Sequence, residues 1–241
     1  MRNWIVAVGL VVGISACNSQ NAITENNQNP DKPLLSMADV VPVKVPKTKE
    51  QKTRQQKFLK ESNKRFKSPQ LASKYYVLQA QRNFNEQKLD SATYLFGRAW
   101  LMDSTNTDIL WGYGKVYGQQ KEYDKALFIL YKALEKDSKN PRLLTDVATS
   151  HLNRFYEANN PQDLLQSKKL LEEAVKYSKE KADAYYKLAI TSYYLSEYNK
   201  AWEYLHKSVK QKKDIADKTF IAALLDKKKD PQGIYDRPST L

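Results

Sequence analysis

Small and large apolar residues recur along the central part of the chain with a spacing of 34 residues. Within each recurrence they stand three and four positions apart, which is the spacing of helices that bury one face. The pattern therefore predicts a series of packed helices. Two occurrences stand 34 residues apart, Asp90-Ser91-Ala92-x3-Phe96-x2-Ala99 and Asp124-Lys125-Ala126-x3-Leu130-x2-Ala133, and a third follows after an offset, Asn199-Lys200-Ala201-x3-Leu205-x2-Ser208.

The clearest single copy of this pattern covers residues 107–140. Its small residues Gly114, Ala126 and Ala133 stand where two antiparallel helices would approach closely, and Tyr117 and Tyr123 would fill the space between them. Spacing and residue types together resemble the tetratricopeptide repeat (TPR) family, whose period is 34 residues. The family's tryptophan at position 4 and its proline near position 32 are absent from every copy. By this resemblance the four copies are residues 73–106, 107–140, 141–181 and 182–215.

The third copy is longer than the others. Its helices are predicted to begin at Pro141 and at Asn160-Pro161, and its seven extra residues are expected around Arg154 to Asn160, in the turn between the helices. Such a loop either contacts a partner or is tolerated drift in length. A ninth helix at 217–228 would cap the last pair. The expected fold is all-α, a right-handed superhelical TPR solenoid of about four hairpins plus a capping helix over 71–230, with a flexible tail at 231–241.

The resemblance also implies a concave binding face, lined by positions 2, 5, 9, 12 and 13 of each first helix. Aromatic and amide groups with a few cations at these positions suit an extended peptide or a flat protein surface. Trp111 has a second interpretation, because it lies one residue after the family's position 4. If it replaces the tryptophan that the family has there, it packs inside the domain and does not face a partner. The predicted partner-binding residues are Val77, Gln81, Phe84, Trp111, Lys115, Gln119, Thr149, Tyr186, Ile190 and Tyr193.

Residues 1–16 have a short basic start, an apolar run and a small-residue end, which is typical of a signal peptide. The run is ~12 residues, or roughly 18 Å as a helix, too short to span a ~30 Å hydrocarbon core. Ile14-Ser15-Ala16-Cys17 resembles the lipobox of bacterial lipoproteins, which implies cleavage before Cys17 and lipidation of its thiol. Asn18 in place of aspartate implies the outer membrane, with the body facing the periplasm. The alternative is a secretory signal with an incidental cysteine.

Two further segments precede the repeats. Residues 17–43 are rich in Asn, Gln and Pro and lack aromatic residues, which predicts a lipidated N-terminus followed by a disordered tether. Residues 44–70 are basic, with ten Lys or Arg against two Glu between Lys44 and Lys67. One interpretation is a solvated helix, and the other is contact with anionic lipid headgroups. The residues assigned to that contact are Lys49, Lys52, Arg54, Lys57, Lys60, Lys64 and Arg65.

Composition excludes several classes of protein. With 7 Gly and 9 Pro among 241 residues the chain is neither collagen-like nor wholly disordered, and one cysteine makes no disulfide framework. The net charge of +13 raises the possibility of nucleic acid, but no nucleic-acid-binding motif accompanies it and an exported protein rarely meets such a partner. Gly112, Gly114 and Gly118 resemble a dinucleotide fingerprint only superficially, because no strand precedes them.

No catalytic motif is present, and His151 and His206 lie in different copies, so we expect no enzyme activity, cofactor or metal site. The sequence favours a membrane-anchored TPR adaptor or scaffold for a protein or peptide in the cell envelope. It would be an assembly factor, similar to pilotins or to accessory factors of barrel assembly. The alternative is glycan or peptidoglycan binding by the groove aromatics. Neither interpretation involves nucleic acid.

Overall fold

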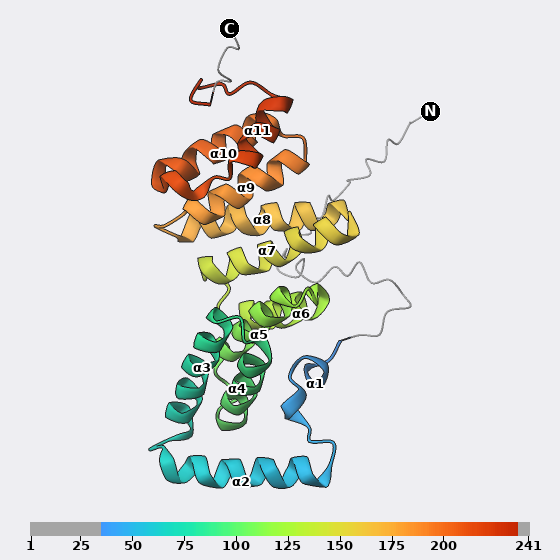
Figure 1. Cartoon of the computed structure of the whole chain (residues 1–241), viewed down its shortest axis with the longest axis vertical. Helices are drawn as coiled ribbons and strands as arrows, with labels where there is room; N and C mark the ends of the chain where they lie inside the picture. The colour runs from blue at the N-terminus through green and yellow to red at the C-terminus, as the bar shows by residue number, and fades with distance from the viewer. Residues whose placement is uncertain (1–34, 236–241) are drawn as a thin grey trace, which may run out of the picture. The chain divides into compact units, whose positions relative to one another are not determined.

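The computed structural model describes residues 35–235, which belong to one compact unit that begins at Leu35. The predicted signal peptide, Cys17 and the residues up to 34 lie outside the described residues. Every regular element in the described range is helical (Figure 1). The elements are α1 (Met37–Val40), η1 (Pro42–Lys44), α2 (Lys49–Arg65), α3 (Pro69–Asn85), α4 (Leu89–Met102), α5 (Thr107–Gln119), α6 (Tyr123–Leu134), α7 (Pro141–Ala158), α8 (Pro161–Tyr177), α9 (Ala182–Tyr194), α10 (Tyr198–Gln211), η2 (Lys213–Ile215) and α11 (Lys218–Lys227).

Helices α3 to α10 form four consecutive pairs, and each pair packs on the next along the chain. The predicted all-α fold of stacked helical hairpins followed by a C-terminal helix is confirmed. The helix starts follow from local chemistry. The side chains of Asn140 and Asn160 accept hydrogen bonds from the first-turn backbone N–H groups of α7 and α8. Pro141 and Pro161 then occupy the first turns, where a missing N–H costs nothing.

Small residues allow the two helices of a pair to approach closely. Ala92, Ala126 and Ala201 are fully buried. A Cβ added at Gly114 would overlap the Leu130 side chain. A Cβ at Gly112 would likewise overlap the Phe96 ring, so these two glycines of α5 serve helix packing and need no nucleotide to explain them.

The third pair differs from the prediction. Its helices have 18 and 17 residues, whereas those of the second pair have 13 and 12. The predicted extra loop at 154–160 is therefore wrong, because the added residues lengthen both helices and leave only Asn159 and Asn160 between them. The residues added at the end of α7 and at the start of α8 include Arg154 and the buried Asp163, whose side chains form an ion pair at 2.7 Å.

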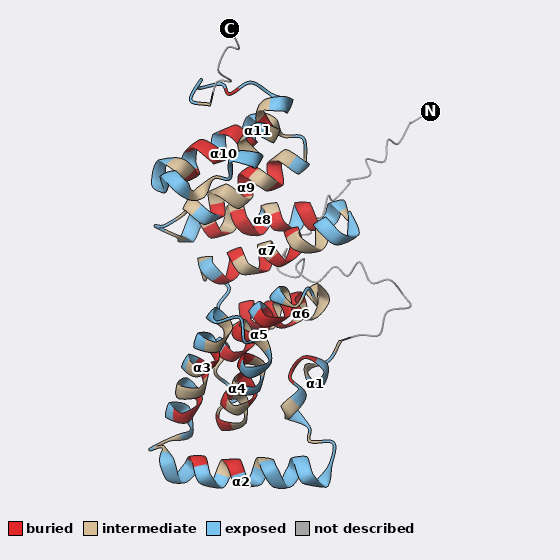
Figure 2. Cartoon of the chain, viewed as in Figure 1, coloured by how far each residue is buried: buried red, intermediate tan, exposed pale blue. Residues whose placement is uncertain are grey.

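The N-terminal segment also differs from the prediction. Residues 35–43 were assigned to the disordered tether, yet α1 and η1 pack on the helix pairs, and Val40 and Val41 are completely buried in the main core (Figure 2). The Tyr117 hydroxyl donates a hydrogen bond to the Val40 carbonyl oxygen at 2.9 Å. The polar composition around it concealed this short apolar stretch.

The described part of the predicted flexible tail is ordered too. The Asp230 carboxylate accepts hydrogen bonds from the backbone N–H groups of Gln232, Ile234 and Tyr235. The Tyr235 ring stacks on Trp202, with 6.0 Å between the centroids. The tail prediction is therefore wrong for residues 231–235, and residues 236–241 lie outside the described residues.

The basic segment contains a single long helix, α2, which begins with a capping box between Thr48 and Gln51. It packs on α3 through Phe58, whose ring meets that of Tyr76 edge to face at 5.4 Å. Only Phe58 and Ser62 of α2 are buried, so most of the helix is exposed (Figure 2).

Candidate protein-binding face

Trp111 on α5 is the centre of a polar and aromatic group on the first helices of the pairs. It is half-buried against the main core, and its indole N–H donates a hydrogen bond to Asp146 Oδ2 on α7 at 2.7 Å. The guanidinium carbon of Arg142 lies 5.7 Å from the Trp111 ring centroid. These two contacts with α7 fix the orientation of the Trp111 ring.

The electrostatics of Asp146 depend on the same neighbours. Burial raises the pKa of its carboxyl group, while the hydrogen bond from Trp111 and the charges of Lys115 and Lys187 act against this rise. Lys187 itself pairs with Asp183 at 2.6 Å on α9. The carboxylate is thus hydrogen-bonded to the second repeat, and the charges that favour its ionised form come from the second and fourth repeats.

Lys115, one turn after Trp111 on α5, extends the group toward the N-terminal repeat. Its ammonium nitrogen lies 4.8 Å from the Phe84 ring centroid on α3, a cation–π geometry. The Lys115 side chain is exposed and Phe84 is half-buried. We call this surface the Trp111 face, and its members are Phe84, Trp111, Lys115, Arg142, Asp146, Asp183 and Lys187.

The structure brings together three of the predicted partner-binding residues, Phe84, Trp111 and Lys115. Val77 does not belong with them. Its side chain is 3% exposed and lies in the main core, so its assignment to the binding face is wrong. Thr149 donates its hydroxyl to the Thr145 carbonyl oxygen of its own helix at 2.7 Å.

The remaining predicted residues lie in different surroundings. Gln119 donates its amide to Gln87 Oε1 at 3.4 Å, across neighbouring turns. Gln81 is exposed and Ile190 is half-buried.

Tyr186 and Tyr193 were also predicted to face a partner, but the capping helix contacts both. The Phe220 ring of α11 lies 5.7 Å from Tyr186 and 5.8 Å from Tyr193, edge to face in each case. The Tyr186 hydroxyl accepts a hydrogen bond from the Asp217 backbone N–H at 3.0 Å. The last helix therefore covers part of both rings, as the end of a repeat stack requires, and both residues stay half-buried, so their role in binding remains a prediction.

Sequence reasoning missed Asp146 and an exposed aromatic pair. Asp146 follows Trp111 by 35 residues, one period plus one residue, and this offset was the available signal. The pair consists of Tyr156 and Tyr194, whose rings meet edge to face at 5.3 Å while 47% and 45% of the two residues remain exposed. Their contact depends on the longer α7, which the sequence did not predict.

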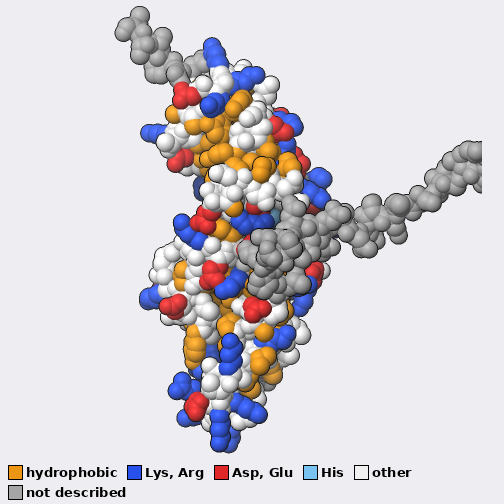
Figure 3. Space-filling view, turned by 90° about the vertical axis from the view of Figure 1, so that its right-hand side faces the viewer, with side chains coloured by type: hydrophobic (Ala, Val, Ile, Leu, Met, Phe, Trp, Pro, Cys, Tyr) orange, Lys and Arg blue, Asp and Glu red, His pale blue; other side chains and the backbone are white. Residues whose placement is uncertain are grey.

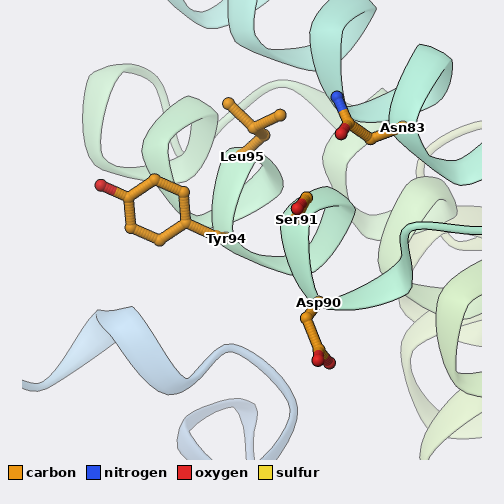
Figure 4. A pocket seen from close by; sticks show the side chains of 5 residues that line it. All are labelled: Asn83, Asp90, Ser91, Tyr94 and Leu95. Atoms are coloured by element: carbon orange, nitrogen blue, oxygen red, sulfur yellow. The ribbon is translucent and has the colours of Figure 1, made fainter.

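Two open hollows lie beside α4. One has a volume of about 440 Å³ and is lined by Asn83, Asp90, Ser91, Tyr94 and Leu95 (Figure 4). In that view the Asp90 carboxylate points away from the Ser91 hydroxyl, so the two do not form a reactive pair. The other hollow, of about 380 Å³, lies between α2 and α4 and shares Tyr94 and Leu95.

Within residues 35–235, no three His, Cys, Asp or Glu side chains are grouped to hold a metal ion. His151 is instead buried between Tyr131 and Asp163. None of the helices in this range is both long enough and apolar enough to cross a membrane.

Comparison with known proteins agrees with the repeat assignment. Residues 84–152 match the tetratricopeptide repeat model. Among solved structures, the chain is similar to PilF of Pseudomonas aeruginosa, with 19% identity and a TM-score of 0.56 over 66% of this chain and 68% of that chain. It is also similar to TTC0263, a TPR protein of Thermus thermophilus, with 14% identity and a TM-score of 0.55 over 65% of this chain and 81% of that chain.

A third similar structure is a MamA protein, with 20% identity and a TM-score of 0.51 over 65% of this chain and 82% of that chain. No curated protein matches the chain in sequence. The likeness to these structures concerns the fold alone. Residues 84–152 therefore match tetratricopeptide repeats in sequence, and the other helix pairs continue the same stacked architecture.

Proposed function

We propose that this protein is a lipid-anchored adaptor of the bacterial cell envelope that binds a protein or peptide partner through the Trp111 face. TPR proteins in general bind such partners. The observation that carries the proposal is the half-buried Trp111 ring, tied to Asp146 and flanked by Lys115 and Arg142. An aromatic ring already fixed in orientation makes a large apolar contact at little further cost in entropy. The two exposed cations suit a carboxylate next to an apolar side chain of the partner.

The anchor in this proposal rests on the sequence Ile14-Ser15-Ala16-Cys17. We propose the outer membrane as its location, with the body facing the periplasm, and assembly of an envelope complex, pilotin-like or accessory to barrel insertion, as its role. Cys17→Ser removes the sulfur that thioether lipidation requires. The variant should leave the membrane fraction under a high-salt wash, and tight retention would contradict the anchor.

The partner face is tested in the producing bacterium with a photocrosslinking amino acid at Lys115. A control places the same amino acid at Lys169, which is exposed on α8. A discrete product at position 115 that is absent at position 169 identifies the partner. Lys115→Glu and Arg142→Glu should each weaken binding of that partner by roughly 1–3 kcal/mol. Each also removes a cation–π contact, so a small fall in melting temperature is expected, limited because both side chains are exposed. Unchanged affinity in both variants would refute the Trp111 face.

Trp111→Ala is a poor test of the Trp111 face. The indole N–H is the donor to a largely buried carboxylate, so its removal destabilises the domain by about 1–3 kcal/mol. Charge reversal at the exposed Lys115 and Arg142 separates a loss of binding from a loss of stability more cleanly.

Glycan binding is the second candidate, and the exposed pair Tyr156 and Tyr194 favours it, because aromatic rings stack on sugar rings. Purified peptidoglycan sacculi separate the two functions. If Tyr156→Ala with Tyr194→Ala abolishes retention on sacculi and Lys115→Glu does not, the glycan function holds. The adaptor function predicts no retention of the unmodified protein at all.

A further inference from the structure

Helix α2 has one face against the rest of the unit. Its Gln55 amide donates to the Val43 carbonyl oxygen at 3.3 Å, and the Ser62 and Tyr76 hydroxyls lie 3.4 Å apart. Phe58 lies between them, with the Arg98 guanidinium carbon 3.8 Å from its ring centroid. Gln55, Phe58 and Ser62 stand three and four residues apart, so they define a single packed stripe.

The opposite face of α2 carries four lysines. With 3.6 residues per turn, Lys49, Lys57, Lys60 and Lys64 point away from the packed stripe, and Thr53 occupies the one remaining place in their row. All four lysines are exposed, and basic side chains gather at this end of the unit (Figure 3). From Lys49 to Lys64 the row extends about 22 Å along a straight helix at 1.5 Å per residue. We call these four residues the lysine row.

The positive charge of the lysine row is paired with almost no acidic side chain of the described residues. Within the described residues its one ion pair joins Lys57 to Glu61 at 4.0 Å, where the side chains are 76% and 66% exposed. Exposed pairs of this kind contribute little. The whole of α2 has seven basic side chains against two acidic ones, a net charge of +5. Its positive charge is therefore free to act on an external partner.

Neither of the two arginines of α2 belongs to the lysine row. The Arg65 guanidinium carbon lies 5.3 Å from the Phe66 ring centroid and 5.2 Å from that of Tyr75. Arg54 is exposed and, together with Lys57, lines the edge of the open hollow beside Phe58. Arginine recognises phosphates and bases through a fixed, forked geometry, whereas a lysine is a point charge that prefers no particular geometry. The outward face thus has the side chains suited to a diffuse anionic surface and lacks those suited to reading bases.

We propose that the lysine row docks on the headgroups of an anionic phospholipid bilayer. The row is straight and carries no apolar residue, so contact would be electrostatic and would involve no insertion. Each cation close to such a surface contributes appreciably to binding, and the effect falls off within a Debye length. This contact needs neither lipidation of Cys17 nor the Trp111 face, which lies on other helices.

The test uses the chain from Asn18 onward, which keeps the whole described unit and omits the apolar run and Cys17. Cosedimentation with phosphatidylglycerol vesicles is compared with phosphatidylcholine vesicles at about 0.1 M and about 1 M salt, between which the Debye length falls from ~10 to ~3 Å. We expect binding to phosphatidylglycerol at low salt only. Replacement of the four lysines of the row by Gln should weaken it about 100-fold or more.

The matched control replaces four other exposed lysines, Lys169, Lys176, Lys210 and Lys213, by Gln and so removes the same charge. It should retain binding within a few-fold, while circular dichroism shows both variants folded. Equal losses in the two variants would mean that only net charge matters and would overturn the proposal. So would equal binding to neutral vesicles, or tighter binding of a DNA duplex that is lost with the lysine row.

Discussion

At the scale of single residues, the turns inside the four pairs share one backbone feature. Gln87, Lys121, Asn159 and Ser196 have φ angles of 60°, 62°, 52° and 60°, in the left-handed region. For a residue with a Cβ this conformation costs roughly 1–2 kcal/mol, and asparagine tolerates it best. The chain therefore places a strained residue in three of these turns, where glycine would be free of strain.

Ser196 gives the cleanest test of this strain, because its side chain is exposed. Ser196→Gly relieves the left-handed penalty but increases the freedom of the unfolded chain, so a net stabilisation of about 0.5–1 kcal/mol is expected. Ser196→Ala keeps the strain and serves as the control. Urea denaturation of the three proteins should rank glycine above serine and alanine. If glycine is the least stable of the three, the turn geometry is not as described.

His151 lies in a buried ionic network. Its Nδ1 is 2.6 Å from Asp163 Oδ1 and its Nε2 is 2.8 Å from the Tyr131 hydroxyl. Arg154 contacts both Asp163, at 2.7 Å, and Asp124, at 2.9 Å. Because an ionised carboxylate only accepts, Nδ1 carries the proton and Tyr131 donates to Nε2. The neutral tautomer of His151 satisfies every partner.

The pKa directions agree with that assignment. Burial lowers the pKa of His151, and the hydrogen bond to Asp163 offsets this only in part. Burial by itself would raise the pKa of Asp163, but hydrogen bonds from His151 and Arg154 outweigh it and leave the pKa lowered. The folded state therefore holds a neutral imidazole beside a carboxylate stabilised by Arg154.

The free energy of unfolding should depend on pH accordingly. Below about pH 6.5, His151 is protonated in the unfolded state but stays neutral in the folded state, because folding lowers its pKa. The free energy of unfolding therefore falls as the pH falls, by up to ~1.4 kcal/mol per pH unit. Asp163 contributes fully to stability above about pH 3.9, the pKa of an unfolded aspartate. This contribution is lost as the pH falls toward the lower pKa that Asp163 has in the folded state. In His151→Gln the amide still donates to Asp163, so the loss between about pH 6.5 and pH 5 should flatten. An unchanged slope in denaturation curves would contradict this account.

At the scale of elements, two glycines of α5 should respond in opposite ways to one methyl group. A Cβ at Gly114 would overlap the buried Leu130 side chain, whereas one at Gly118 would have only Ser150 Oγ nearby, at 3.9 Å. Gly114→Ala should cost about 1–3 kcal/mol through overpacking, and Gly118→Ala should stabilise the helix by up to ~1 kcal/mol. Thermal unfolding of both variants checks the difference. A loss of stability in both would mean that the packing at Gly118 is misassigned.

Periodicity predicted the helix pairs because each helix buries the same positions in every copy, and Ala126 and Gly114 carry that signal within a single repeat. It failed at the third pair, where the repeat length says that residues were added but not whether they extend helices or a loop. The added residues are held by contacts of Arg154 with Asp163 of the same pair and with Asp124 of the preceding pair. The sequence does not state these contacts.

At the scale of the whole molecule, the same limit applies to the candidate site. Family positions correctly grouped Phe84, Trp111 and Lys115, since that grouping follows from the period. They did not predict that Asp146 would hold Trp111, or that Phe220 would cover Tyr186, because both contacts depend on how one repeat or cap sits against the next. The predicted residues that do lie together are therefore those whose positions follow directly from the repeat period.

The packing of the N-terminal segment on the repeats limits the distance between the proposed anchor and the rest of the protein. Val40 and Val41 are buried in the core that the repeats share, so the chain is fixed to the stack from Leu35 onward. Between Cys17 and that point only residues 18–34 remain. Even fully extended they span at most about 60 Å. In the proposed lipoprotein this length limits how far the Trp111 face can lie from the bilayer.

Val41→Asp tests the packing of this segment. A carboxylate cannot be buried there without a partner, so residues 35–45 should leave the stack. The melting temperature then falls and proteases cut within the segment, while circular dichroism still shows a helical protein because the four pairs keep their own contacts. Val45→Asp introduces the same charge four residues later, at a side chain that is 57% exposed, and should change neither measurement. If both variants resist cleavage equally, the segment is not held as the structure has it, and the limit on reach from Cys17 falls with it.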